Sequence, residues 1–309
     1  MEKWNNLKGY LFVGIAGSLW GIGGFFVTKM SESGASSLMT AFTGHLLAFI
    51  PLLLLLIVKK GVAGLKISKK GLLFSILLGV LCKGIFKLCL DTSMTMVGVA
   101  TTTILMYLAP VWTSIMAMIF FKEKLRGYQK FALVLNLVGC VLMVTGGNFA
   151  EFNISGLGLF LGLMAGILYA LSTILGKLGT SGDDPLAMAC YMLMFSSITT
   201  AIFARPWEHL DLFTNRPFML WAVLGGVLSG SVANLFFLNG LATGIDASKA
   251  TIVTSVEVVI ATVAGVFLLN EKVNLVGYIG IVVMLSSIVI MNINLKKSKE
   301  VIEDQVFQL

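Results

Sequence analysis

The chain has 309 residues, of which 57% are hydrophobic and only 12% are charged, and its formal net charge is +7. A soluble protein of this length carries about twice that charged fraction, so the composition excludes an ordinary soluble domain and indicates a membrane protein. The four cysteines lie within apolar runs and lack the spacing of a metal site or a disulfide framework.

Ten apolar segments are long enough to cross a bilayer, which takes about 17–25 largely uncharged residues. In chain order they are residues 10–28, 37–58, 71–90, 97–121, 131–145, 156–176, 187–203, 218–238, 247–269 and 273–291. The first segment is too long and too rich in glycine for a cleaved signal peptide, so we expect it to be retained. Glycines four residues apart, such as Gly17 and Gly21, predict close helix packing.

The Lys and Arg residues are distributed unevenly among the loops. If the N-terminus is cytoplasmic, most of them fall in cytoplasmic segments, and the outer segments hold only Lys29, Arg205, Arg216 and Lys272. The positive-inside rule therefore predicts ten spans in the cytoplasmic cell membrane, with both termini on the cytoplasmic side. The basic surplus is a topology signal and does not indicate nucleic-acid binding.

The two halves of the sequence resemble each other at an offset of 148 residues, without a gap over residues 88–126 and 236–274. The polar identities are Thr95 with Thr243, Glu123 with Glu271 and Lys124 with Lys272. Each half holds five spans, and an odd number forces the second half to enter the membrane from the opposite side. We expect an all-α polytopic membrane protein of two inverted five-helix repeats, residues 1–150 and 151–295, with a cytoplasmic tail at 296–309. Such inverted repeats are typical of secondary transporters that bind substrate near the midplane.

Each half also carries a short motif followed by an acidic residue at a helix junction. The first copy is Leu108-Ala109-Pro110-Val111 followed by Phe121-Lys122-Glu123-Lys124-Leu125, and the second is Ser255-Val256-Glu257-Val258 followed by Leu269-Asn270-Glu271-Lys272. With the inverted duplication, these motifs resemble the EamA-type family of the drug/metabolite transporter superfamily. The resemblance implies a ten-helix transporter, and it implies export coupled to proton entry as the more frequent activity of the family.

Two positions depart from that family pattern. Val258 stands where the family usually has a proline, so we expect a softer helix bend in the second copy. Gly44 and His45 stand near a position where the family often has an arginine, which puts any role of that arginine in doubt.

Lys83 and Glu257 are charged residues near the predicted mid-depth of their spans. A charge at the centre of a membrane helix costs roughly 2.5–3.5 kcal/mol on insertion scales, so each is a functional candidate. Lys83 lies about 18 Å into its span at about 1.5 Å per residue, and Lys87 and Asp91 continue the same stripe toward the outer mouth. We predict that Lys83 and Lys87 line a substrate cavity. The alternative for Lys87 is an ordinary surface pair with Asp91.

Glu257 is a candidate carrier of a coupling proton, and the alternative is that it stabilises a helix bend. Its depth matches that of Lys83, which suggests a charge pair between them. The repeat supports both as site residues, because Lys83 corresponds to Ser231 and Glu257 to Ala109. We expect residues that differ between the two halves to contact substrate, and residues that both halves share to maintain the fold.

Three further residues are candidates for the substrate site. His45 either lines the pathway or makes a hydrogen bond within the bundle, Tyr107 is a cavity candidate, and Trp20 either stacks on a substrate or packs in the core. Glu123 is shared by both halves, and we expect it to be structural, by neutralising amide N–H groups at a helix start.

The sequence therefore predicts a secondary transporter, working by alternating access, of a small polar metabolite such as an amino acid or an organic acid. Efflux of cationic or aromatic drugs is an alternative that would favour Glu257 over Lys83, and a non-transporting scaffold or sensor is another. The sequence has no phosphate-binding loop, His/Cys metal cluster or hydrolase serine motif, so we expect neither an enzyme nor a cofactor. The expected partners are the small-molecule substrate, the lipid bilayer and a proton as the coupling ion.

Overall fold

The computed structural model describes residues 2–148, 155–270 and 272–292. All regular elements in these ranges are helices, and ten of the helical segments are long and apolar enough to cross a membrane. The predicted all-helical fold of ten spans is thereby confirmed. Glu271 and the predicted tail at 296–309 lie outside the described residues.

The first half runs from α1 to α7. Its elements are α1 (Glu2–Ser31), α2 (Ser37–Lys60), η1 (Val62–Leu65), α3 (Lys69–Gly79), the π-helical turn η2 (Val80–Ile85), α4 (Phe86–Val97), α5 (Val99–Met106), α6 (Ala109–Phe121) and α7 (Gly127–Thr145). The third span consists of α3, η2 and α4, and the fourth consists of α5 and α6.

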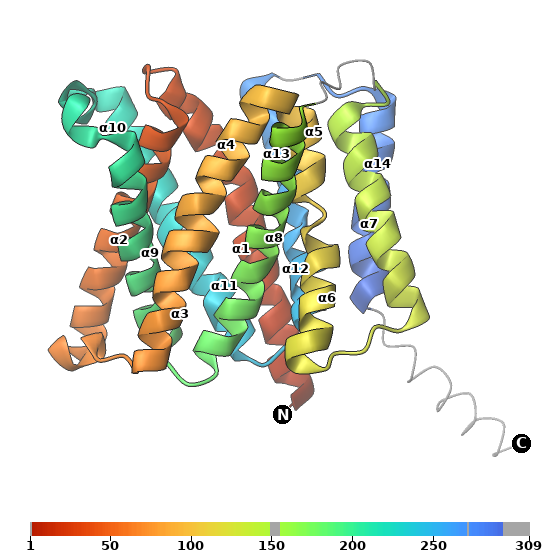
Figure 1. The fold of residues 1–309 in the computed structure, drawn as a ribbon, viewed down its shortest axis with the longest axis horizontal. Coiled ribbons are helices and arrows are strands. Elements are labelled where there is room, and N and C mark those ends of the chain that lie inside the picture. The colour runs from red at the N-terminus through yellow and green to blue at the C-terminus, as the bar shows by residue number, and fades with distance from the viewer. Residues whose placement is uncertain (1, 149–154, 271, 293–309) are drawn as a thin grey trace, which may run out of the picture.

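The second half repeats this order. Its elements are α8 (Gly156–Thr180), α9 (Pro185–Ala204), the short turns η3 (Pro206–Glu208) and η4 (Leu210–Thr214), α10 (Arg216–Gly225), the π-helical turn η5 (Gly226–Val232), α11 (Ala233–Ala242), α12 (Ala247–Thr254), α13 (Val256–Leu269) and α14 (Leu275–Asn292). Helix α1 rises in Figure 1 whereas its counterpart α8 descends, as an inverted repeat requires.

Equivalent helix ends use equivalent chemistry at the same offset. Ser36 caps α2 by accepting a hydrogen bond from the Met39 N–H, and Asp184 caps α9 in the same way. Helices α6 and α13 both end in a left-handed residue, Lys122 at φ 54° and Asn270 at φ 56°. The similarity of the two halves therefore extends from the sequence to the helix caps.

Spans four and nine are both interrupted near mid-depth. Span four breaks at Tyr107 and Leu108, just before Pro110. Span nine breaks at Ser255 alone, although Val258 replaces the proline. The break without proline is thus present but shorter, and Asn136 of α7 supports it by donating to the Ser255 hydroxyl at 2.8 Å.

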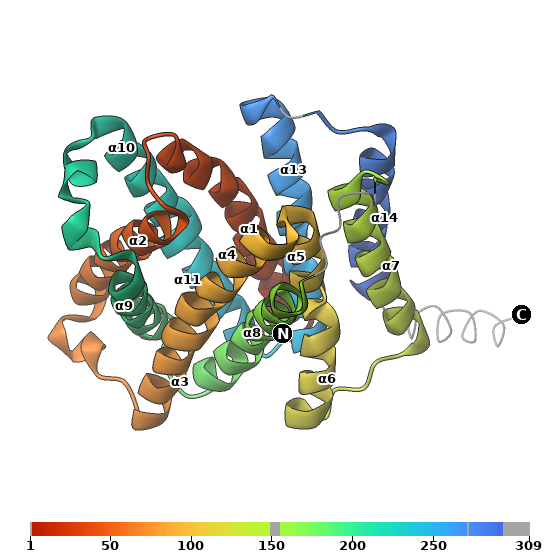
Figure 2. The same ribbon diagram turned by 45° about the horizontal axis from the view of Figure 1, so that its top comes forward.

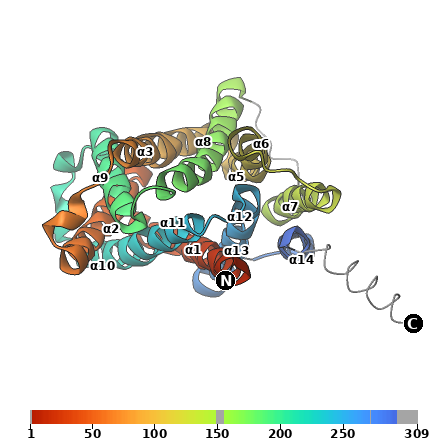
Figure 3. The same ribbon diagram turned by 90° about the horizontal axis from the view of Figure 1, so that it is seen from below.

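Helices α1 and α8 pack against these breaks, α1 against α12 and α13 and α8 against α5 and α6. Along the length of the bundle, both lie between its two ends (Figure 3). A Cβ atom added to Gly17 would lie 2.5 Å from the Thr254 carbonyl oxygen, and one added to Gly21 would lie 2.5 Å from the Glu257 carbonyl oxygen. The predicted close packing at these glycines is confirmed. Helices α7 and α14 pack together at one edge, and α2, α9 and α10 lie at the other (Figure 2).

Candidate functional site

Lys83 lies in η2, midway between Lys69 and Val97 at the ends of the third span. Its Nζ is 4.7 Å from the centroid of the Trp20 ring, which is the geometry of a cation–π contact. No described carboxylate oxygen comes within 4.0 Å of this Nζ, and the side chain is partly exposed. An ammonium group has three N–H donors and no acceptor, so Lys83 keeps donors for a ligand.

Trp20 is held in place from its other side. Its ring packs against Phe237 of α11, with centroids 5.0 Å apart. The indole therefore lies between Lys83 and the second half of the protein. The ring is partly buried and packs against the core, as one interpretation from the sequence expected, and stacking on a substrate stays a prediction.

Glu257 lies in the first turn of α13, directly after the break at Ser255, and close to the midpoint of Ala247–Leu269. The Tyr169 hydroxyl donates a hydrogen bond of 2.7 Å to Glu257 Oε2. The Tyr169 ring also packs against Phe86, with centroids 5.9 Å apart. Tyr169 thus positions the carboxylate from the central helix α8.

Lys83 and Glu257 interact electrostatically across the interior, but they do not form the direct ion pair that their equal depth suggested. Each has an aromatic partner instead, Trp20 for the lysine and Tyr169 for the carboxylate. Two opposite charges thus lie near each other at mid-depth without contact, each with hydrogen-bonding capacity left.

Tyr107, at the break of span four, is buried at 5% exposure. It belongs to an apolar cluster with Cys140 and Val258, and it interacts electrostatically with Glu257 and Tyr169. The structure therefore buries Tyr107 among apolar side chains, within electrostatic range of the Glu257 carboxylate.

His45 and Lys87 have polar partners of their own. His45 Nδ1 lies 2.8 Å from the Ser196 hydroxyl, which joins α2 to α9. Lys87 Nζ lies 2.6 Å from Asp91 Oδ1 and 2.5 Å from the Ser37 hydroxyl. Lys87 thus forms the pair with Asp91 that was its alternative, whereas Lys83 turns away from that pair toward α1.

The sequence analysis did not single out Tyr169. Its equivalent in the first half is Gly21, so a large polar residue stands where the other half has no side chain. The same comparison that drew attention to Lys83 and Glu257 would have found it. Among the described residues, no group of three or more His, Cys, Asp or Glu side chains is arranged to hold a metal ion.

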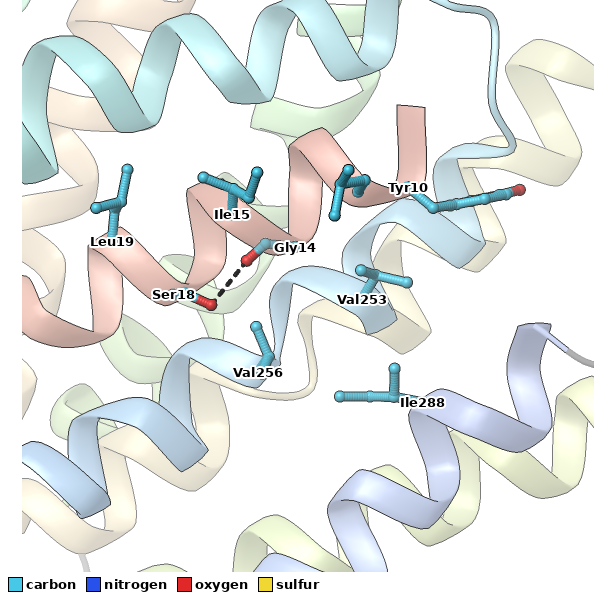
Figure 4. Close-up of a pocket in the computed structure, with 9 residues that line it drawn as sticks. Tyr10, Gly14, Ile15, Ser18, Leu19, Val253, Val256 and Ile288 are labelled. Atoms are coloured by element: carbon cyan, nitrogen blue, oxygen red, sulfur yellow. Dashed lines mark hydrogen bonds between the residues drawn. The ribbon is translucent and has the colours of Figure 1, made fainter. Parts of the chain in front are cut away.

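A separate hollow of about 410 Å³ lies on the other side of α1, between that helix and α12, α13 and α14 (Figure 4). Its lining is apolar apart from Tyr10 and Ser18, and the Ser18 hydroxyl is already bonded to the Gly14 carbonyl oxygen at 3.0 Å. This lining does not suit a polar substrate, so the group around Lys83 and Glu257 is the better candidate.

Comparison with known proteins identifies the fold. The model of the EamA-like transporter family matches the chain twice, over residues 7–145 and 156–293. A solved crystal structure superimposes with a TM-score of 0.74 over 92% of this chain and 96% of that one, and its 14% identity supports the fold alone.

Named relatives share the fold and differ in what they carry. The chain is 25% identical over 225 residues to the uncharacterized transporter YwfM of Bacillus subtilis, which covers 72% of this chain and 75% of that protein. It is 29% identical over 180 residues to an S-adenosylmethionine uptake transporter of Rickettsia prowazekii, covering 58% of each. It is also 29% identical over 183 residues to the riboflavin transporter ImpX of Fusobacterium nucleatum, covering 56% and 60%. The matches to these last two proteins span less than two thirds of either chain.

Proposed function

The chain belongs to the EamA-like transporter family and is a multi-pass membrane transporter rather than an enzyme, and on that premise we propose its substrate class and mechanism. The protein is a secondary transporter of a small polar metabolite that carries a carboxylate, an amino acid or an organic acid. The substrate binds between Lys83 and Glu257, and the repeats at 1–150 and 151–295 expose it alternately to the two sides. The unpaired ammonium of Lys83 at mid-depth is the observation that carries this proposal.

An anionic substrate would complete the environment of Lys83. A charge at the centre of a membrane helix is costly unless it is paired, and the face of Trp20 supplies only part of that compensation. A carboxylate accepts charge-assisted hydrogen bonds from an ammonium group, and these are roughly twice as strong as neutral ones. The free donors of Lys83 therefore favour a substrate that carries an anion.

Glu257 offers a second recognition point. Its Oε2 accepts the hydrogen bond from Tyr169, and no described residue makes a hydrogen bond of 3.5 Å or shorter to Oε1. That oxygen can take the amino group of a zwitterion or a proton. We propose export coupled to inward movement of protons through Glu257, with both termini in the cytoplasm, as the Lys and Arg distribution favours.

The aromatic rings of the site favour one alternative substrate class. Trp20 lies beside Lys83 and Tyr169 beside Glu257, and the ring of Phe86 packs against that of Tyr169. Rings beside a carboxylate also suit a cationic or aromatic drug. In that case Glu257 would hold the substrate, and Lys83 would be dispensable.

Transport by purified protein in liposomes tests the proposal. Uptake of amino acids, organic acids and organic cations is measured for wild type, Lys83→Met, Glu257→Gln and Lys8→Met, the last being an exposed lysine with the same change. We expect saturable uptake of an anionic or zwitterionic compound that Lys83→Met abolishes and Lys8→Met preserves. Uptake of a cation that depends on Glu257 but not on Lys83 would establish the alternative. A folded protein that moves none of the compounds would overturn the proposed substrate class.

A further inference from the structure

Glu123 ties the two halves together at the face where α1 begins and α14 ends, here called the N-terminal face (Figure 1). We propose that Glu123 is a gating residue, which keeps the pathway closed at the N-terminal face by holding the start of α12. The inference rests on the proposed function only in assuming alternating access. It assigns to Glu123 a positioning role in the transport cycle and no contact with substrate.

The carboxylate of Glu123 joins three helices. Its Oε1 accepts hydrogen bonds from the Ala247 N–H at 2.8 Å and from Lys177 Nζ at 2.9 Å. Its Oε2 accepts from the Ser248 hydroxyl at 2.7 Å and from the Ser248 N–H at 3.3 Å. The side chains of Glu123 and Lys177 are 11% and 16% exposed. A single side chain, two residues after the end of α6 in the first half, therefore anchors α8 and α12 of the second.

Helix α12 depends on Glu123 because its own capping residue is engaged elsewhere. Asp246 precedes the helix and is of a type preferred at that position, but it makes no side-chain capping bond. Its carboxylate pairs with Lys249 at 2.9 Å. The first amides of α12 are thus satisfied by a carboxylate from the other half, and only while the halves are together at this face.

A buried layer seals the same face one turn deeper. The Thr251 hydroxyl lies 3.2 Å from that of Thr113 on α6 and 3.1 Å from that of Thr173 on α8. A Cβ added to Gly176 of α8 would lie 2.7 Å from Leu241 Cδ1 of α11. The N-terminal face is therefore closed by α6, α8, α11 and α12 together.

At the opposite face, the described residues make fewer such contacts at the equivalent positions, and Glu271, the counterpart of Glu123, lies outside the described residues. Helix α5 corresponds to α12, but no described side chain caps its start after Gly98. Lys29 corresponds to Lys177, but it pairs with Glu32 of the adjoining loop, and the two side chains are 27% and 55% exposed. Within the described helices, the contact of α1 with α4 is less extensive than that of α8 with α11, and the contact of α13 with α5 is less extensive than that of α6 with α12.

The equivalent threonines Thr251 and Thr103 differ in exposure between the two faces. Thr251 is 1% exposed in the closed layer, whereas Thr103 is partly exposed. The described residues thus close the N-terminal face, and the equivalent described threonine at the other face is more exposed. Opening the N-terminal face has to break the bonds of Glu123, so loss of this carboxylate shifts the population toward the open state.

The test compares cysteine accessibility at these two threonines. Thr251→Cys and Thr103→Cys are made separately in a background without the four native cysteines, all of which are buried. Labelling rates with a water-soluble thiol reagent are then measured with and without Glu123→Gln. Glu32→Gln is the matched control, because it removes the exposed ion pair at the opposite face.

In Glu123→Gln we expect labelling at Thr251→Cys to rise at least about tenfold, the lower end of the effect of losing one hydrogen bond to a charged group, and labelling at Thr103→Cys to fall. Glu32→Gln should change neither rate. Lys177→Met removes the same ion pair and should shift both rates in the same directions, which provides a second variant if Glu123→Gln folds poorly.

Unchanged rates would overturn the gating role. So would a rise at Thr251→Cys with no fall at Thr103→Cys, because that result indicates only local fraying of α12. The labelling needs no substrate, so it can succeed even if the liposome assay finds no transported amino acid or organic acid. Failure of the gate and failure of the proposed substrate class are thus distinguishable.

Discussion

The π-helical turns η2 and η5 occupy equivalent places in the two halves but carry different side chains. Ser231 of η5 is 2% exposed and donates a hydrogen bond of 2.7 Å to the Ala48 carbonyl oxygen of α2. Its counterpart Lys83 is partly exposed and has the face of Trp20 as its partner. The π-helical turn thus carries a packing residue in the second half and, in the first half, a lysine without a described carboxylate partner in ion-pair distance.

The helices α1 and α8 differ in the same way. Gly21 lets α1 approach the backbone at Glu257, whereas its counterpart Tyr169 on α8 reaches the Glu257 side chain. The equivalent of Glu257 in the first half is Ala109, which is 1% exposed. Each of these pairs combines a packing residue with a polar one. The comparison indicates that the two halves share a scaffold and differ at the few mid-depth positions that form the candidate site.

The largest effect is expected from Lys83→Ser, which places in η2 the residue type that η5 has at the equivalent position, Ser231. We expect uptake of the anionic substrate to fall about a hundredfold, as for loss of a hydrogen bond between charged groups worth about 1.5–3 kcal/mol. Stability should not fall, because an intramembrane charge costs roughly 2.5–3.5 kcal/mol. Liposome uptake and the thermal unfolding midpoint check both parts. Retained uptake would contradict a substrate role for Lys83.

A smaller effect is expected from Tyr169→Phe, which removes the hydroxyl bound to Glu257 and keeps the ring against Phe86. Transport efficiency should fall about tenfold, since a hydrogen bond to a charged group contributes about 1.5 kcal/mol or more. The matched control is Tyr191→Phe, whose hydroxyl donates to the Leu65 carbonyl oxygen at 2.8 Å, away from the site. Equal losses in both variants would indicate a general packing defect.

The fold was predictable because its signals are local or periodic. Ten apolar runs gave the spans, and the offset of 148 residues gave the inverted repeat. The break of span nine was harder to predict, because Val258 replaces the expected proline. The break is supported by Asn136, which donates to Ser255 at 2.8 Å from α7, and by α1, which packs against it through Gly17. Contacts so distant in sequence leave no local signal.

The sequence predicted how deep the candidate site residues lie in the membrane, but not which neighbouring helices their side chains face. Helical rise placed Lys83 and Glu257 at similar depth, and symmetry marked both as unusual. The i, i+4 spacing that grouped Lys83 with Lys87 assumes a regular α-helix, but Lys83 lies in a π-helical turn and Lys87 in α4. A π-turn changes the spacing to i, i+5, which turns Lys83 relative to the pair of Lys87 and Asp91. Partners such as Tyr169 come from other helices, and spacing along one helix cannot identify them.

The mildest way to sharpen the comparison is Trp20→Phe. A phenyl ring keeps an aromatic face for Lys83 and for Phe237 but is a weaker cation–π partner than indole. We expect the apparent affinity for an anionic substrate to change about threefold, because such contacts contribute about 0.5–1 kcal/mol. The measurement is the substrate concentration at half-maximal uptake, with Trp221→Phe as the control, since that ring contacts Phe25 and Phe26 away from the site.

The direction of that change tells which role the indole has. If Trp20 only positions Lys83, the weaker cation–π contact in Trp20→Phe weakens substrate binding, and the maximal rate stays near that of wild type. If Trp20 competes with substrate for the ammonium group, Trp20→Phe binds substrate more tightly and releases it more slowly, so the maximal rate falls. Identical values in Trp20→Phe and Trp221→Phe would show that the cation–π contact does not tune the site. The asymmetry between the halves would then rest on Lys83, Tyr169 and Glu257 alone.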